Sequence, residues 1–352
     1  MKERNSNIEL LRIICMIFII GGHLIMYHEG GAIVGSTGYY ISNIMRSFFM
    51  CAVNTFVLIS GYFGVKFNVK KLIKLDINTI TYSVGIFIIM VLLGIHQVDI
   101  KKDILLFIPV VTKRYWFISI YFVLCIISPI LNKFIDYIEE YKLKTVIIVM
   151  ISLFYVLPTI LYSINAPTIT EDSGYGIINF ICLYIIGRYI KCYKVNHKKK
   201  SLYLGIYLLA VGSLFLSNHV LSKLLGFYFN AFISYDTVFN LLAAYGLFML
   251  FLNINIKSKL INILSQYSLA VYIIHMQPTV SKYLFVDLLK INSFQGLRYI
   301  ISICIIPIII YLSCWCIEFI RVKLFNKIED KAINIIFNKF SLKVIEEKIT
   351  LI

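Results

Sequence analysis

The sequence predicts an all-α integral membrane protein, a polytopic bundle of about ten transmembrane helices with both termini in the cytoplasm. Three observations favour this fold. Of the 352 residues, 60% are hydrophobic, and the mean hydropathy is +0.85. Apolar runs of about 20 residues, the length that crosses a bilayer as a helix, recur along the chain. Lys and Arg gather on one side of the predicted bundle, which fixes the expected orientation.

Ten apolar segments are the expected spans. Those at 78–95, 115–131 and 174–190 are shorter than ideal, so we expect these helices to be tilted or extended. We find no internal repeat and no soluble domain between the segments, and the chain is therefore expected to form one membrane domain over residues 1–320. In chain order the expected spans are 8–27, 43–63, 78–95, 115–131, 145–163, 174–190, 202–218, 237–254, 267–287 and 297–319.

The orientation follows from the unequal distribution of positive charge. With the N-terminus placed inside, 25 of the 34 Lys and Arg residues fall on the inner side and nine on the outer side. Short cytoplasmic loops carry such an excess in membrane proteins. The net charge of +16 therefore indicates topology, and no basic stripe with interleaved aromatics suggests binding to nucleic acid.

Residues 321–352 form a tail in which apolar and charged side chains alternate. This pattern is typical of an amphipathic helix that lies on a membrane surface. We expect a cytoplasmic tail that contacts membrane lipids and has no catalytic role.

The eight cysteines are scattered through apolar runs, and Cys314 and Cys316 form the closest pair. This spacing is not that of a metal site or of a disulfide framework. We therefore expect apolar packing for the cysteines and no bound metal.

The strongest candidate site is a polar stripe in the first span, made by Glu9, Arg12 and His23. Eleven residues make about three helical turns, so Arg12 and His23 share one face, and Glu9 precedes Arg12 by one turn. Ionisable side chains inside a span are functional-site hypotheses by default. A neutral histidine can accept a hydroxyl proton, an arginine can hold a phosphate, and Glu9 can fix the arginine rotamer. Taken singly, a hydrogen-bonded packing histidine and an arginine that reaches to the membrane surface remain open alternatives.

A second candidate lies at the end of the second span, where Ser60 and Tyr62 precede a cluster of lysines. Lys70 and Lys74 are four residues apart, and Lys71 and Lys74 three apart, so they form one positive patch where the third span begins. Such a patch suits lipid head groups or a polyphosphate ligand. A plain positive-inside loop is the alternative.

Two further motifs carry aromatic and polar side chains into spans. In the ninth span, Ser268, Tyr272 and His275 share one helix face, and a histidine there again needs a partner. Trp116 opens the fourth span from outside, in an aromatic run that suits either an interfacial belt or a platform for a sugar ring. Packing is the alternative for His275.

In this order, the motifs resemble those of the membrane-bound acyltransferase-3 family, the bacterial O-acetyltransferases of surface polysaccharides. Glu9 to His23 is similar to the first-helix signature of that family, and Phe56 to Tyr62 is similar to its F-x-x-x-S-G-Y motif. Tyr115–Phe117 and Tyr267–His275 are similar to its fourth-helix and near-terminal patterns. The resemblance extends over most of the chain, from Arg4 to about His275.

One motif departs from the family pattern. Lys71 and Lys74 stand where members that carry extracytoplasmic esterase-like domains tend to have R-x-x-R. Lysine keeps the positive charge and loses the bidentate fork of arginine. The role of this pair in binding donor phosphates is therefore weaker on the sequence alone.

The resemblance implies a multi-pass enzyme of the bacterial cell membrane that moves an acetyl or other small acyl group from cytoplasmic acyl-CoA to a hydroxyl of a cell-surface or lipid-linked polysaccharide. Acetyl-CoA would be the donor, no metal would take part, and polysaccharide biosynthesis proteins would be partners. The expected catalytic residues are His23, Arg12 and Glu9. Arg12, Lys71, Lys74, Ser60 and Tyr62 would bind the donor, and Trp116, Tyr272 and His275 the acceptor.

Two other function classes compete with this interpretation. A transporter or flippase for a polysaccharide or lipid-linked sugar would also have many spans and an intramembrane arginine, but it would show paired broken helices in two halves. A non-catalytic subunit or sensor would tolerate replacement of Arg12 and His23. Binding of acetyl-CoA from the cytoplasmic side separates the enzyme from the transporter.

Overall fold

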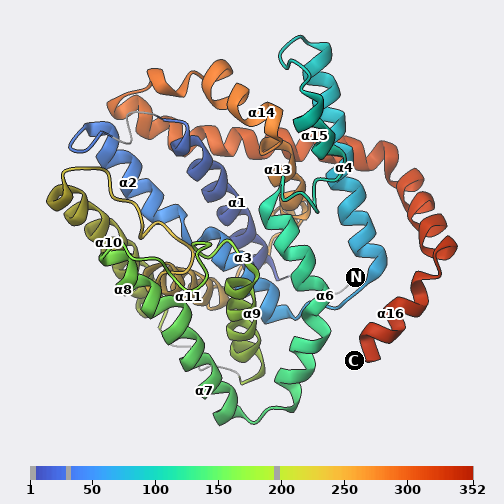
Figure 1. Ribbon diagram of the computed structural model, residues 1–352, viewed down its shortest axis with the longest axis horizontal. Coiled ribbons are helices and arrows are strands. Elements are labelled where there is room, and N and C mark those ends of the chain that lie inside the picture. The colour runs from blue at the N-terminus through green and yellow to red at the C-terminus, as the bar shows by residue number, and fades with distance from the viewer. Residues whose placement is uncertain (1–4, 29–32, 194–198, 352) are drawn as a thin grey trace. The chain divides into compact units, whose positions relative to one another are not determined.

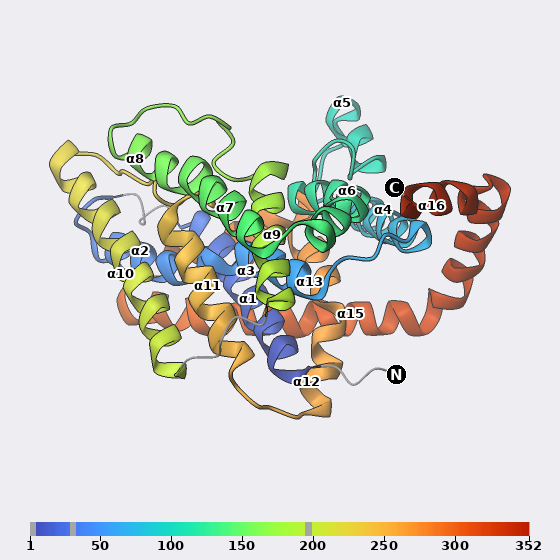
Figure 2. The same ribbon diagram turned by 90° about the horizontal axis from the view of Figure 1, so that it is seen from below.

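The computed structural model describes residues 5–28, 33–193 and 199–351, and this part of the chain is helical with no strand (Figures 1 and 2). Lys2, Arg4, Lys194 and Lys198, which enter the charge count above, lie outside it. The described helices include seven segments long and apolar enough to cross a membrane: Ser6–Met26, Thr37–Phe63, Val69–Leu92, Trp116–Tyr137, Glu140–Ser163, Lys200–Leu225 and Gly296–Lys339. The prediction of an all-helical, multi-pass membrane protein is confirmed.

Shorter helices complete the chain. The elements are α1 Ser6–Met26, α2 Thr37–Phe49, α3 Cys51–Phe63, α4 Val69–Leu92, α5 Ile100–Asp103, α6 Trp116–Tyr137, α7 Glu140–Ile151, α8 Leu157–Ser163, α9 Ile177–Cys192, α10 Lys200–Leu225, α11 Val238–Leu252, α12 Lys259–Leu264, α13 Ser268–His275, α14 Pro278–Lys282, α15 Gly296–Lys339 and α16 Leu342–Leu351. A π-helical turn, Ser152–Val156, joins α7 to α8, and a second, Tyr283–Leu288, follows α14.

Two of the ten predicted spans coincide with helices that are short for a bilayer. Helix α9 has 16 residues and α11 has 15. At about 1.5 Å per residue, such helices reach less than the roughly 30 Å of a hydrocarbon core. The count of about ten spans and the cytoplasmic placement of the termini therefore remain predictions.

The predicted span 267–287 is wrong as a continuous helix. Helix α13 ends at His275, and α14 begins at Pro278 after the extended residue Gln277, whose φ is −57° and ψ 127°. Proline disfavours helical backbone at the residue before it, and this explains the break. Gln277 is fully buried, and its side chain accepts the N–H groups of Thr279 and Val280 and donates to the Ser83 carbonyl of α4. The interrupted backbone is thus satisfied inside the protein, as a membrane requires.

Helix α15 has 44 residues and continues without interruption through residue 320, where the tail is expected to begin. The Ser341 turn, with φ of 49°, separates it from α16. The division into a membrane domain over 1–320 and a tail over 321–352 remains a prediction.

The described residues form two compact units. Unit 1 comprises those of Met1–Gly64, Ile135–Gln266 and Lys290–Ile309, and unit 2 those of Val65–Phe134, Tyr267–Leu289 and Ile310–Ile352. In unit 1, α1 packs on α2 and α3, and α10 packs on α11. In unit 2, α4 packs on α13, α14 and α16.

Helices α3 and α9 of unit 1 approach closely through glycines. A Cβ on Gly61 would lie 2.3 Å from the Tyr184 carbonyl oxygen, and one on Gly187 would lie 2.4 Å from that of Leu58. Because backbone atoms cannot yield as a flexible side chain can, only glycine fits these positions. The glycine of the Ser60–Tyr62 motif therefore has a packing role.

Candidate functional site

The polar stripe of α1 begins with a paired arginine. Arg12 Nη1 donates to Glu9 Oε1 over 3.2 Å, as the three-residue spacing predicts. Glu9 is buried in the first helical turn, where a carboxylate also meets the positive end of the helix dipole. The Arg12 side chain is 34% exposed and keeps further N–H donors available to a ligand.

His23 lies near the other end of α1 and is partly exposed. It stands about 16 Å from Arg12 along the helix, at ~1.5 Å per residue. Two residues earlier α1 presses against α2, because a Cβ on Gly21 would lie 2.6 Å from the Phe49 ring. This contact fixes the turn that carries His23. Arg12 and His23 are therefore two separate positions on one rigid helix, not partners of each other.

Ser60 and Tyr62 are held within unit 1 by their own neighbours. Ser60 Oγ donates to the Phe56 carbonyl one turn earlier, so the helix itself satisfies this hydroxyl. The Tyr62 ring packs edge-on against Phe248 at 5.4 Å, and Lys191 Nζ lies 4.9 Å from its centre. Neither residue hydrogen-bonds to Arg12 in the described part of the chain.

In unit 2, the lysines of the predicted phosphate patch differ from one another. They lie in the first turns of α4, which begins at Val69, nine residues before the predicted span. Lys71 is exposed. Lys74 Nζ donates to Asn326 Oδ1 at 2.8 Å and to Asp330 Oδ1 at 2.9 Å on α15. A phosphate at Lys74 would have to displace these contacts, whereas Lys71 is available.

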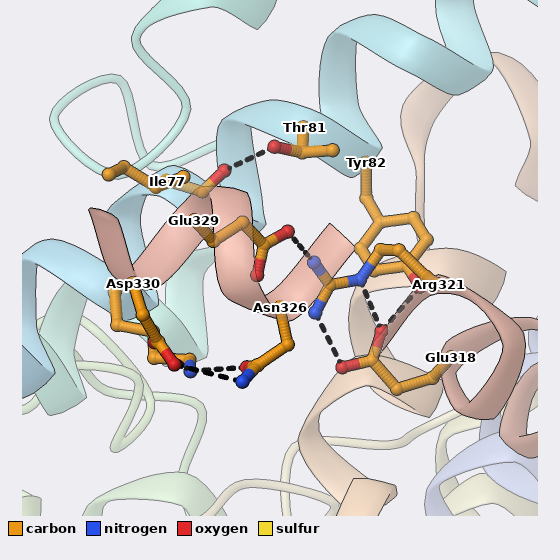
Figure 3. Close-up of polar contacts among 9 residues, drawn as sticks. Ile77, Thr81, Tyr82, Glu318, Arg321, Asn326, Glu329 and Asp330 are labelled. Carbon is orange, nitrogen blue, oxygen red and sulfur yellow. Dashed lines mark hydrogen bonds and ion pairs between the residues drawn. The ribbon is translucent and has the colours of Figure 1, made fainter. Parts of the chain in front are cut away.

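A buried ionic cluster in unit 2 escaped the sequence analysis. Arg321 is 8% exposed and makes a bidentate pair with Glu318, at 2.6 and 2.8 Å, and a further ion pair with Glu329 (Figure 3). The Tyr82 hydroxyl of α4 donates to Glu318 at 2.5 Å. One guanidinium thus meets two carboxylates. The three-residue spacing of Glu318 and Arg321 at the end of the last predicted span was the available signal.

Unit 2 brings Tyr272 and His275 together with the aromatic run that opens α6. The Tyr272 ring makes edge contacts with Tyr115 at 6.2 Å, Phe117 at 5.9 Å and His275 at 6.1 Å. Trp116 is partly exposed beside Phe117. Tyr272 and His275 are buried, so as acceptor ligands they would lie deep in unit 2.

The contacts of His275 define its tautomer. Its Nδ1 lies 2.6 Å from the Val271 carbonyl oxygen. A carbonyl only accepts, so Nδ1 carries the proton and Nε2 is left as an acceptor. This arrangement is also that of a packing histidine, and the acceptor-binding role assigned to His275 remains a prediction.

Comparison with known proteins defines the class. The acyltransferase-3 family model, described as an acyltransferase domain, matches residues 5–319, from the start of α1 into α15. No curated protein and no solved structure matches the chain. The match includes the α1 stripe and the break after α13, and it ends just before Arg321. The chain belongs to the acyltransferase-3 family and is a multi-pass membrane protein with acyltransferase activity.

Proposed function

We propose that this chain transfers an acetyl or other small acyl group from cytoplasmic acyl-CoA to a hydroxyl of a cell-surface or lipid-linked polysaccharide, in the bacterial cell membrane. The observation that carries the proposal is the α1 stripe, with an acid-paired arginine near one end and a partly exposed histidine about 16 Å away. Family membership supports acyl transfer, and the stripe supplies one group for each half of the reaction.

The donor binds through its phosphates. The Arg12 guanidinium of unit 1, oriented by Glu9, forms the bidentate contact. Lys71 of unit 2, which is exposed, stays assigned to the donor by its charge. Lys74 contributes once Asp330 and Asn326 release it. Ser60 and Tyr62 stay assigned to the donor, and Trp116, Tyr272 and His275 to the acceptor.

His23 acts on the acceptor. In its neutral form it takes the proton of the sugar hydroxyl while that oxygen attacks the thioester carbonyl. The carbon–sulfur bond then breaks, and the departing thiolate of CoA takes the proton from the imidazolium. A second route, in which His23 first accepts the acyl group and then passes it on, uses the same position. An acyl adduct trapped on His23 by mass spectrometry would distinguish the two.

The test uses the full chain in lipid nanodiscs with acetyl-CoA and a saccharide acceptor extracted from the parent surface polysaccharide. Release of the CoA thiol and acetyl NMR signals of the product report transfer. His23→Gln is expected to lower the rate by about a hundredfold or more. The matched control His96→Gln removes a histidine that pairs with Asp103 in a loop and should not change the rate. Normal transfer by a folded His23→Gln protein would overturn the mechanism.

A flippase for lipid-linked sugars is the second candidate, because of the break at Gln277. Discontinuous helices mark binding sites in many transporters. A flippase would move its substrate without binding acetyl-CoA, so calorimetric titration of acetyl-CoA into the same nanodiscs separates the two functions.

A further inference from the structure

Arg46 is a charged side chain in a candidate membrane span, and no carboxylate of the described residues pairs with it. It lies in α2, part of the candidate span Thr37–Phe63, and is partly buried. In the described part of the chain its one hydrogen bond runs from Nη1 to the Tyr228 hydroxyl, at 2.9 Å, and it has no salt bridge. An arginine in an apolar membrane segment costs free energy unless an anion or polar groups compensate its charge.

The other helical arginines show how unusual this is. Arg12, Arg188 and Arg321 each form an ion pair with a carboxylate. Arg298 forms no ion pair with a described residue, but it is exposed and lies over the Phe294 ring at 4.3 Å, where water can solvate it. Among the described residues, Arg46 combines partial burial with a charge that no carboxylate pairs, and four of its five N–H donors make no hydrogen bond there.

The groups around Arg46 in unit 1 are hydroxyls and amides. The Tyr228 hydroxyl that accepts from Arg46 lies 3.4 Å from Asn43 Oδ1, one turn back on α2. Ser42, four residues before Arg46 on α2, has its Oγ 2.9 Å from the Tyr299 hydroxyl. Burial raises the pKa of Tyr228, and the charge of Arg46 works against that rise. These neutral dipoles orient the guanidinium without neutralising it.

Aromatic rings surround the same region of unit 1. Tyr39 packs edge-on against Tyr228 at 5.9 Å, and His28 stacks on Tyr299 at 3.9 Å. His28 is 7% exposed, its Nε2 lies 3.1 Å from the Phe294 carbonyl, and its buried Nδ1 has no hydrogen-bond partner among the described residues. The carbonyl assigns the proton to Nε2, so Nδ1 is an acceptor that lacks a donor. A buried acceptor without a donor is destabilising, and a ligand hydroxyl would satisfy it.

We propose that Arg46 and the tyrosines around it bind an anionic oxygen group, a carboxylate or a phosphate, carried by the saccharide acceptor. A planar guanidinium matches both anions through two parallel hydrogen bonds. Tyrosine rings offer an apolar face with a polar edge, which suits the faces and hydroxyls of a sugar. Nδ1 of His28, which no described residue hydrogen-bonds, is an acceptor for one of those hydroxyls.

The expected topology places this site on the acceptor's side. With the N-terminus in the cytoplasm, α2 is expected to begin at the outer surface. Arg46 lies nine residues after the first residue of α2, about 14 Å along the helix at ~1.5 Å per residue. The identification of the ligand as an acceptor rests on the proposed function. The anion site itself rests on Arg46 and its neighbours.

The experiment measures binding to the full chain in nanodiscs by titration calorimetry. Tri-galacturonate supplies the carboxylate, glucose 1-phosphate the phosphate, and maltotriose is the neutral reference. The wild-type protein is expected to bind one charged probe at least about tenfold more tightly than maltotriose. The charged probe that binds more tightly than maltotriose shows whether the site takes a carboxylate or a phosphate. Arg46→Gln should abolish the gain, and Arg46→Lys, which keeps the charge without the fork, should keep part of it.

The control Arg298→Gln removes an exposed arginine of the same unit and should keep the full preference. Equal affinity of the wild-type protein for all three probes, or an undiminished preference in Arg46→Gln, would overturn the site. Acetyl-CoA is titrated into the same samples. A protein that binds the charged saccharide but no acetyl-CoA refutes the proposed function and leaves the anion site standing. If Arg46→Gln fails to fold, Arg46→Lys decides: a reduced preference with a normal unfolding transition supports the site, and an undiminished preference overturns it.

Discussion

Arg321 of unit 2 and Arg46 of unit 1 both lie in long apolar helical segments, but the groups that contact their guanidinium groups differ. Arg321 is 8% exposed and is held by Glu318 and Glu329, whereas Arg46 is met by one tyrosine hydroxyl. A buried arginine that carries its own counter-charges has no use for an anionic ligand. Arg46, which no carboxylate of the described residues pairs, is available for one, and we therefore assign a structural role to Arg321 and a binding role to Arg46.

Asp236 extends the contrast to the opposite charge. This carboxylate precedes α11 in unit 1 and is buried, and its hydrogen bonds from a side chain come from the Tyr162 hydroxyl, at 3.0 and 3.1 Å. No salt bridge joins it to a cation among the described residues. Burial raises the pKa of Asp236 to about 6. Unit 1 therefore holds an arginine, Arg46, and an aspartate, Asp236, that each form a side-chain hydrogen bond with a tyrosine hydroxyl.

The largest effect is expected from breaking the Arg321 cluster. Arg321→Met leaves Glu318 and Glu329 buried without a cation, and should lower the free energy of unfolding by about 3–5 kcal/mol. Chemical denaturation in detergent micelles measures it. The double variant Glu318→Gln, Arg321→Met removes one of the stranded charges and should recover part of the loss. A single variant as stable as the wild-type protein would remove the basis of the comparison.

Asp236 predicts a pH dependence of stability. Its pKa in the folded protein, about 6, lies above the value of 3.8 for a free side chain, so the folded state binds the proton more tightly. Stability from this group is therefore complete below about pH 4 and is lost as the pH rises through 6. At about 1.4 kcal/mol per pKa unit the loss is about 3 kcal/mol. Asp236→Asn should abolish this part of the pH dependence, and parallel unfolding curves for the two proteins between pH 4 and 8 would contradict the prediction.

Arg46 should matter little for folding. Arg46→Met removes one hydrogen bond to Tyr228 and leaves no described carboxylate without its cation, so the free energy of unfolding should change by about 1 kcal/mol or less. The same denaturation series measures it beside Arg321→Met. A loss as large as that of Arg321→Met would show that Arg46 is structural, and the contrast between the two arginines would collapse.

The sequence predicts the helices of this protein well because hydropathy is a local property. Pro278 is a local signal too, since proline is favoured at a helix start, and attention to it would have divided the predicted span 267–287. Glu318 and Arg321 are a readable three-residue pair. An arginine between the apolar residues of segment 43–63 was equally visible, although its significance was not.

The partners of these side chains are what sequence reasoning could not supply. Tyr228 lies 182 positions from Arg46, Tyr82 lies 236 from Glu318, and Asp330 lies 256 from Lys74. Such contacts between residues far apart in the sequence decide whether an intramembrane charge has a counter-charge. A single sequence does not reveal them. The Arg12–Glu9 pair was predicted because both residues lie within one turn of one helix.

The smallest effect concerns Lys74, the exposed counterpart of Arg321. Its ion pair with Asp330 joins side chains that are 37% and 50% exposed, so Lys74→Gln should lower stability by about 0.5 kcal/mol, an effect that fades in high salt. Lys71→Gln removes an exposed charge that forms no ion pair with a described residue, and it should leave stability unchanged. For binding of the acyl donor, Lys71→Gln should have the larger effect of the two variants. Lys71 is available to a phosphate, whereas Asp330 and Asn326 hold Lys74. Lys71→Gln is therefore expected to raise the KM for acetyl-CoA more than Lys74→Gln does, and the opposite order would mean that the donor takes Lys74 from α15.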